Sequence, residues 1–254
     1  MNKDCKIVTI SNRIPTQDYY TYQYLQKSAG SNEILVLGQQ PGEYTGLSDK
    51  PRILYHAVKN GLITEKYICF VDAWDVVFAD TLESIMDKYK SFNSPIVIGS
   101  EKNCFPSHFK KEYDRLPNTS SYKYLNSGVI IGETEAILEV LEAMDAANLP
   151  RDYHNSQTGT NYHFNDQAMY MDMYLRQPVK MKLDYDCLIA QNMQDVTEDE
   201  IVYWGGCSVN PVNAKMYSFI KNKETGTSPS IVHWNGSSKT GWSREKILKH
   251  LNLL

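Results

Sequence analysis

The sequence predicts a single α/β domain whose mostly parallel central sheet is flanked by helices. Three observations point to this class. Short β-branched and aliphatic runs alternate with helix-compatible segments, which is the pattern of strand–helix–strand units with right-handed crossovers. The chain has 254 residues, enough for one large hydrophobic core. It contains no internal repeat and no low-complexity tract.

The first half of the chain shows the alternation most clearly. The pattern predicts strands at residues 6–11, 33–37 and 67–72, and helices at 19–28 and 50–60. Gly30 and Gly61 are the expected helix stops, and Gly38 ends the second strand. The residues between the second strand and the second helix have the composition of a loop.

The second half is predicted to continue the same order with longer loops. We expect helices at residues 81–90, 133–147, 164–176 and 243–253, the last with Ser243 as its N-cap. Strands are expected at 95–99, 124–132, 179–183 and 230–233. Residues 100–121 and 151–163 lack a clear period and are predicted to be loops; so long an irregular segment as 100–121 is often an active-site loop.

Composition excludes several classes of protein. A net charge of −4 and a pI near 5.9 disfavour a non-specific nucleic-acid binder. The five cysteines are scattered and form no Cys-x-x-Cys pair, so neither a zinc ribbon nor a disulfide framework is indicated. No apolar run approaches the length of a membrane span, and no signal-peptide pattern opens the chain, so a cytoplasmic location is expected.

Asp72 and Asp75 stand at the end of the apolar run that begins at Tyr67. Ligands of parallel α/β sheets bind just outside the carboxyl ends of the strands, so both carboxylates are expected at the rim of a crevice, with Trp74 between them. Such a pair suits a hard divalent cation that bridges to phosphate oxygens. The alternative interpretation is a strand followed by an Asp-capped turn.

Other polar residues also fall at predicted strand ends or loop bases, namely Asn126, Asp166, Asp184 and His233. Each has a structural alternative: His233 as a hydrogen-bonded core residue, Asp166 as a helix cap, Asn126 as part of a turn before a strand. If these positions converge on one crevice, two aspartates and a histidine form a ligand set suited to Mn²⁺, with Mg²⁺ as the other candidate.

Several nucleotide and hydrolase motifs are missing from the sequence. It has no Gly-x-x-x-x-Gly-Lys-Ser/Thr loop and no Gly-x-Gly-x-x-Gly after the first strand. A Gly-x-Ser-x-Gly elbow is also absent. A nucleotide held through a carboxylate-bound metal, without a P-loop, is the chemistry of nucleotide-sugar transferases.

The chain resembles the glycosyltransferase domain of the procollagen lysyl hydroxylases (the PLOD family). The resemblance lies in five blocks in the same order, from about residue 5 to 240: Phe70-Val71-Asp72-Ala73-Trp74-Asp75, Tyr124-Leu125-Asn126-Ser127-Gly128, Asn165-Asp166-Gln167, Leu183-Asp184 to Gln191-Asn192, and His233-Trp234-Asn235-Gly236. It implies a GT-A fold that binds a UDP-sugar through Mn²⁺. It also implies a nucleotide-binding part at about 5–132 and a sugar and acceptor part at about 133–254.

The resemblance assigns roles to particular residues of this chain. Asp72, Asp75 and His233 would bind the metal. The expected nucleotide-sugar contacts are Thr9, Lys50, Asp72, Trp74, Gly236 and Lys239. The expected catalytic residues are Asn126, Asn165 and Asp166. The implied reaction moves a hexose (glucose, galactose or GlcNAc) to a hydroxyl of a protein or glycan acceptor, including collagen-like galactosyl- or hydroxylysine, and a dimer is one oligomeric state to test.

Two positions depart from the family pattern. Asn165 stands where the family has a second aspartate, and Phe105 stands where it has a tryptophan in a loop over the site. In the family, both positions lie on the side of the site where the sugar or the acceptor binds. The substitution at Asn165 motivates one alternative, a UDP-sugar-binding module without transfer activity. A metal-dependent phosphoesterase using Asp72, Asp75 and His233 is another, although it lacks the further His/Asp clusters of a two-metal site.

Overall fold

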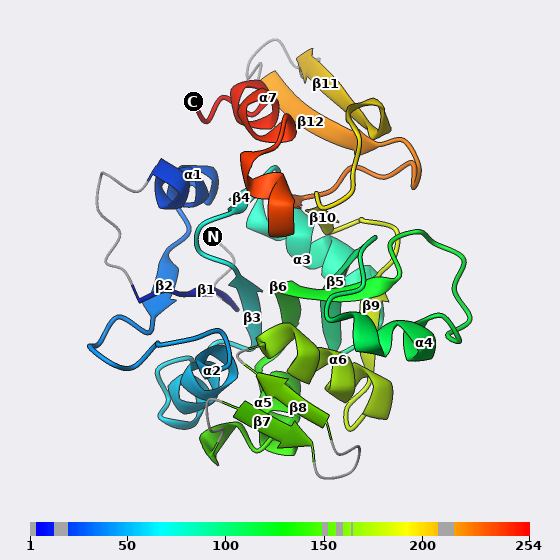
Figure 1. Ribbon diagram of the computed structural model, residues 1–254. Helices are drawn as coiled ribbons and strands as arrows, with labels where there is room; N and C mark the ends of the chain where they lie inside the picture. The colour runs from blue at the N-terminus through cyan, green and yellow to red at the C-terminus, as the bar shows by residue number, and fades with distance from the viewer. Residues whose placement is uncertain (1–3, 13–19, 149–151, 156–159, 164, 208–215) are drawn as a thin grey trace.

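The computed structural model describes residues 4–12, 20–148, 152–155, 160–163, 165–207 and 216–254 (Figure 1). Its strands are β1 (Cys5–Ile10), β2 (Ile34–Leu37), β3 (Tyr67–Val71), β4 (Val76–Phe78), β5 (Ile96–Glu101), β6 (Tyr124–Glu133), β7 (Asp152–Asn155), β8 (Thr160–His163), β9 (Met181–Asp184), β10 (Ala190–Asn192), β11 (Ile201–Cys207), β12 (Met216–Asn222) and β13 (Ile231–His233). Its helices are α1 (Tyr20–Ser28), α2 (Asp49–Lys59), α3 (Leu82–Ser91), α4 (Lys110–Tyr113), α5 (Thr134–Ala143), α6 (Asp166–Arg176) and α7 (Ser243–His250), with 3₁₀ turns η1 (Ser107–Phe109), η2 (Ala146–Asn148), η3 (Glu198–Glu200) and η4 (Gly236–Thr240).

The central sheet has six strands in the order β2-β1-β3-β6-β5-β9. The pairs β1–β2, β1–β3 and β5–β9 are parallel, whereas β6 runs antiparallel to both β3 and β5. The expected mostly parallel sheet is therefore confirmed, with one reversed strand near its middle. Because β6 is reversed, its first residues lie at the same edge as the carboxyl ends of its neighbours.

Helices cover both faces of this sheet (Figure 1). Alternate residues of β3 point to opposite faces: Ile68 and Phe70 pack with residues of α2, α5 and α6, and Cys69 and Val71 pack with residues of α1 and α3. Strands buried on both faces are rich in apolar and β-branched residues, which is why β3 and the aliphatic stretches of β1 and β6 were recognisable in the sequence. The larger core cluster contains Val8 from the first half of the chain and Leu183 from the second half, so both halves contribute to one core.

Three smaller sheets complete the described structure. β10, β13 and β4 form a three-stranded sheet, and β11–β12 and β7–β8 form two-stranded ones. A third apolar cluster, around the buried Trp234, packs α7 against this part of the molecule. In Figure 1, α7 and the β11–β12 pair lie at the upper end of the molecule, beyond the central sheet.

Some boundaries and loops differ from the sequence predictions. The predicted loop at 151–163 contains the antiparallel strands β7 and β8, and the predicted loop at 100–121 contains η1 and α4. Ser243 is not the N-cap of α7; Trp242 occupies that position, and the Ser243 hydroxyl accepts a hydrogen bond from the Trp234 indole instead. Tyr19, Arg151 and Phe164, at the ends of predicted segments, lie outside the described residues.

None of the helices in the described part of the chain combines the length and the apolar character that crossing a bilayer requires. The cytoplasmic location expected from the sequence gains no support from this finding and stays a prediction.

Candidate active site

The connection between β3 and β4 brings Asp72 and Asp75 to the edge of the central sheet at which β3 ends. β3 belongs to the central sheet and β4 to the three-stranded sheet, so the intervening residues pass from one sheet to the other. Backbone bonds hold this passage: the Asp72 N–H donates to the Gly128 carbonyl, and the Asp75 carbonyl accepts from the Trp234 N–H. Both carboxylates are thereby set at the carboxyl end of β3, as the sequence predicts.

His233 ends β13, the middle strand of the three-stranded sheet, and its ring faces both aspartates. Nε2 lies 3.6 Å from Asp75 Oδ2 and 3.8 Å from Asp72 Oδ2. On the other side of the ring, Nδ1 lies 2.7 Å from Asn192 Oδ1. The Asn192 amide group donates to the Ser100 carbonyl, which fixes its oxygen toward His233. Nδ1 is therefore the protonated nitrogen, and Nε2 is available as a metal ligand.

Asp72, Asp75 and His233 form a candidate metal centre whose ligand atoms all lie within 4.8 Å of one another. Burial acts to raise the pKa of Asp75, but His233 and Lys239 outweigh it and hold that pKa well below its usual range. Burial acts to lower the pKa of His233, yet the Asp75 carboxylate raises it above the ordinary value. A divalent cation would replace the proton that these carboxylates favour on Nε2.

Lys50 and Asp166 form a second charged group beside the metal centre. The buried Lys50 ammonium lies 2.6 Å from Asp72 Oδ1 and 3.6 Å from Asp166 Oδ2. Ser127 donates its hydroxyl proton to the same Asp166 oxygen. Asp166 is the first residue of α6 but not its cap: Asn165 is the N-cap, and its side-chain oxygen accepts from the Ala168 N–H.

The turn after His233 supplies the other lysine. Lys239, in η4, places its ammonium 2.8 Å from Asp75 Oδ2. Gly236 begins this turn with a φ of +58°, and a Cβ atom there would lie 2.5 Å from Gln194 Oε1. The positive φ therefore favours glycine at position 236, where the turn packs on Gln194 and presents Lys239 to the metal centre.

Glu101 is a site residue that the sequence analysis missed. This buried carboxylate, the last residue of β5, accepts hydrogen bonds from the side-chain amides of Asn126, Gln167 and Asn235. Burial raises the pKa of Glu101, although these amides act in the opposite direction. Asn126 also accepts from the Gly128 N–H, so it positions both Glu101 and the backbone beside His233. The one available signal was an acidic residue two positions after the end of the strand predicted at 95–99.

These residues line one cleft of about 430 Å³. The predicted residues that it brings together are Lys50, Asp72, Asp75, Asn126, Asn165, Asp166, His233, Gly236 and Lys239, and Phe105 also lines it. Among the described lining residues, four carboxylates and two ammonium groups leave a formal charge of −2 with His233 neutral. The ligand types and this charge both fit one divalent cation.

Three residues singled out in the sequence are placed elsewhere. Thr9 is fully buried, and its hydroxyl donates to the Val71 carbonyl. Trp74 packs with the apolar cluster that contains residues of α1 and α3, where its ring centroid lies 6.3 Å from that of Tyr22. Asp184 accepts three backbone N–H bonds from residues 188–190, so it holds a turn together. None of the three is among the residues lining the cleft.

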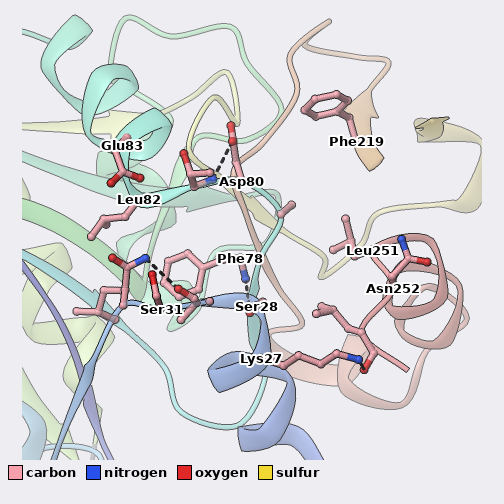
Figure 2. A pocket seen from close by; sticks show the side chains of 17 residues that line it. Lys27, Ser28, Ser31, Phe78, Asp80, Leu82, Glu83, Phe219, Leu251 and Asn252 are labelled. Carbon is pink, nitrogen blue, oxygen red and sulfur yellow. Dashed lines mark hydrogen bonds between the residues drawn. The ribbon is translucent and has the colours of Figure 1, made fainter. Parts of the chain in front are cut away.

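A larger hollow of about 600 Å³ lies away from these groups. Figure 2 shows it between the end of α1, the start of α3, β12 and the C-terminal residues, with Lys27, Ser28, Asp80, Glu83, Phe219 and Leu251 around it. It contains neither the candidate metal ligands nor the residues around Glu101. The smaller cleft is therefore the candidate active site.

The fold is that of the GT-A glycosyltransferases. Mouse xyloside xylosyltransferase 1 in its apo form superimposes with a TM-score of 0.50, covering 92% of this chain and 98% of that chain at 11% sequence identity. At so low an identity, the likeness concerns the fold alone.

The sequence comparisons define the family. A family model described as "PLOD GT domain" matches residues 14–244, so the chain belongs to the PLOD glycosyltransferase-domain family. A procollagen-lysine,2-oxoglutarate 5-dioxygenase of Drosophila melanogaster is 26% identical over 69% of this chain and 22% of its own length. The multifunctional procollagen lysine hydroxylase and glycosyltransferase LH3 of Rattus norvegicus is 26% identical over 68% of this chain and 20% of its own. The chain thus spans about a fifth of the length of these relatives.

Proposed function

We propose that this protein transfers a hexose from a UDP-sugar to a hydroxyl group in a reaction that depends on Mn²⁺. The observation that supports it most directly is the ligand set of Asp72, Asp75 and His233, with all three ligand atoms within 4.8 Å, in a member of a glycosyltransferase family. A bound divalent cation would supply Lewis-acid stabilisation of the departing diphosphate.

The side chains of this cleft have distinct proposed tasks. Lys50 and Lys239 add positive charge where the diphosphate would lie, the kind of electrostatic stabilisation that often dominates such reactions. Asp166, held by Lys50 and Ser127, orients the sugar or stabilises positive charge at its anomeric carbon. Asn126 and Glu101 keep the cleft wall in place. A nucleotide contact of the buried Thr9 requires its surroundings to move, and one of Trp74 requires the nucleotide to extend beyond the cleft.

The acceptor is proposed from the relatives. Their names refer to procollagen lysine, so a collagen-like hydroxylysine or galactosylhydroxylysine is the first acceptor to test, followed by glycan acceptors. Phe105, a residue that is 58% exposed, lines the cleft and would be accessible to a large acceptor. Aromatic rings are suited to stacking on sugar faces.

The test is UDP release from a panel of UDP-sugars, with and without collagen-like peptides, in Mn²⁺, Mg²⁺ or chelator. One preferred donor, consumed only with metal and faster with acceptor, is the expected result. UDP binding without turnover under any condition would favour a UDP-sugar-binding module. Release of inorganic phosphate instead of UDP would favour a phosphoesterase, and absence of any UDP binding would refute the proposal.

A further inference from the structure

We propose that Lys239 competes with the metal for Asp75 and thereby makes the binding of a divalent cation and of the nucleotide diphosphate mutually dependent. The inference builds on the proposed function, because it requires both ligands to share the cleft. Before the diphosphate binds, the Lys239 ammonium occupies the carboxylate oxygen of Asp75 that the metal needs.

The competition follows from which oxygen atom Lys239 contacts. Its ammonium lies 2.8 Å from Asp75 Oδ2. The same oxygen is the one that faces His233 Nε2, at 3.6 Å. A cation bound between Asp75 and His233 must therefore take the oxygen that Lys239 holds. Two positive charges cannot share that position, so metal binding displaces the ammonium.

Lys50 differs in this respect, although it also contacts a candidate metal ligand. Its ammonium bonds Asp72 Oδ1, whereas the other oxygen, Oδ2, is the one that faces His233. Lys50 also keeps Asp166 as a second partner. A metal at Asp72 Oδ2 therefore leaves the contacts of Lys50 in place. Of these two lysines, only Lys239 contacts a carboxylate oxygen that the metal would bind.

The surroundings of Lys239 allow it to move. Its side chain is 53% exposed, whereas that of Asp75 is only 5% exposed. A flexible lysine therefore reaches from solvent onto a buried carboxylate and can leave it without disturbing the core. After displacement, the ammonium is tethered beside the metal by η4, where it lacks a counter-ion until an anion enters the cleft.

A diphosphate supplies that counter-ion, which is the physical basis of the coupling. Without nucleotide, the metal must break the Lys239–Asp75 pair and remain near an uncompensated positive charge. With nucleotide, the displaced ammonium gains phosphate oxygens as partners. The metal therefore raises the affinity for UDP, and by linkage UDP raises the affinity for the metal by the same factor.

The experiment measures Mn²⁺ binding by the loss of the free-ion electron paramagnetic resonance signal, with and without UDP, for wild type and Lys239→Met. We expect Lys239→Met to bind Mn²⁺ alone about threefold to tenfold more tightly, because the competing cation is gone. We expect the same variant to bind UDP about tenfold more weakly at saturating Mn²⁺. The coupling factor, which is the factor by which Mn²⁺ raises the affinity for UDP, is therefore smaller in Lys239→Met than in wild type.

Lys246→Met is the matched control. Lys246 lies on nearby α7 and pairs with Glu198 at the surface, so its removal deletes one positive charge without touching Asp75. It should leave both affinities unchanged. The inference is overturned if Lys239→Met binds Mn²⁺ alone no more tightly than wild type, or if Lys246→Met tightens it equally, which would indicate a general charge effect.

The two proposals fail in different ways. If the wild-type protein binds Mn²⁺ but not UDP, the proposed function fails, and the comparison of Mn²⁺ affinities still tests whether Lys239 competes for Asp75. If UDP binds and is released from a UDP-sugar, but the coupling factor is the same in wild type and Lys239→Met, the function stands and the role of Lys239 is rejected.

Discussion

Gly128 and His233 lie so close together that a Cβ atom on Gly128 would be 2.1 Å from Cε1 of the His233 ring. Gly128 belongs to β6 of the central sheet, and His233 ends β13 of the three-stranded sheet. The missing side chain at Gly128 is therefore what allows the imidazole to pack between the two sheets with Nε2 toward the aspartates.

Gly128→Ala should displace the His233 ring and abolish Mn²⁺ binding. The added methyl group cannot fit without moving the imidazole, and overpacking of this kind costs about 1–3 kcal/mol of stability. Mn²⁺ affinity and the free energy of unfolding, from denaturant titration, should both fall. Gly205→Ala, where an added Cβ meets nothing within 4 Å, is the control and should retain metal binding.

Asp75→Ala should remove Mn²⁺-dependent nucleotide binding while the protein stays folded. The change deletes one of the ligands and frees Lys239, whose ammonium would then repel the cation. Calorimetric titration with UDP and Mn²⁺ measures the loss, and circular dichroism checks the fold. Asp186→Ala, at an exposed aspartate outside the cleft, should behave as wild type. Unchanged binding by Asp75→Ala would rule out the metal assignment.

Glu101→Gln should destabilise the protein and impair the cleft. Both Glu101 oxygens accept bonds from side-chain amides, so replacing one by an amide nitrogen sets donor against donor. An unmet buried hydrogen-bonding group costs about 1–3 kcal/mol, which urea unfolding can measure. A stability within error of wild type would show that Glu101 is not needed to hold these amides.

Two variants of Asn165 distinguish a structural role from a role in the choice of donor sugar. Its oxygen caps α6, so Asn165→Ala should cost about 1 kcal/mol, whereas Asn165→Asp keeps an equivalent cap and should be nearly neutral. Asp brings a negative acceptor where Asn offers N–H donors, so Asn165→Asp should change the order of preference among UDP-sugars. Thermal denaturation and steady-state kinetics with each donor measure the two effects; an unchanged order would limit Asn165 to capping.

The raised pKa of Asp184 predicts that the stability of the protein depends on pH. Burial raises its pKa to about 6, although three backbone N–H groups favour the charged form. The folded state then binds this proton more tightly than the unfolded state, whose pKa is near 3.9. The contribution of Asp184 to stability is therefore full below about pH 4 and is lost as the pH rises to about 6. Denaturation of wild type and Asp184→Asn across this interval should show that the variant lacks this loss; parallel profiles would contradict it.

Much of the fold could be predicted because its strands are buried on both faces. β3 is an unbroken apolar run, β1 and β6 are rich in β-branched and aliphatic residues, and the predicted helices α2, α3 and α6 begin or end within a residue or two of the observed ones. β11 and β12 were not predicted, because their residues have no alternation strong enough to separate a strand from a loop. The pair β7–β8 was hidden in the same way by its polar sequence.

The residues of the candidate metal centre could be predicted because their chemical types and their positions at strand ends are local features of the chain. Asp72 follows β3 directly, Asp75 stands just before β4, and His233 ends β13, so each could be recognised without knowing its neighbours. The tertiary structure alone decided which partner each charge has. Lys239 on one Asp75 oxygen, Lys50 on the far oxygen of Asp72, and Glu101 among three amides join segments far apart in sequence. Such contacts depend on how the sheets and helices pack, and side-chain packing across a core leaves no periodic signal in a single sequence.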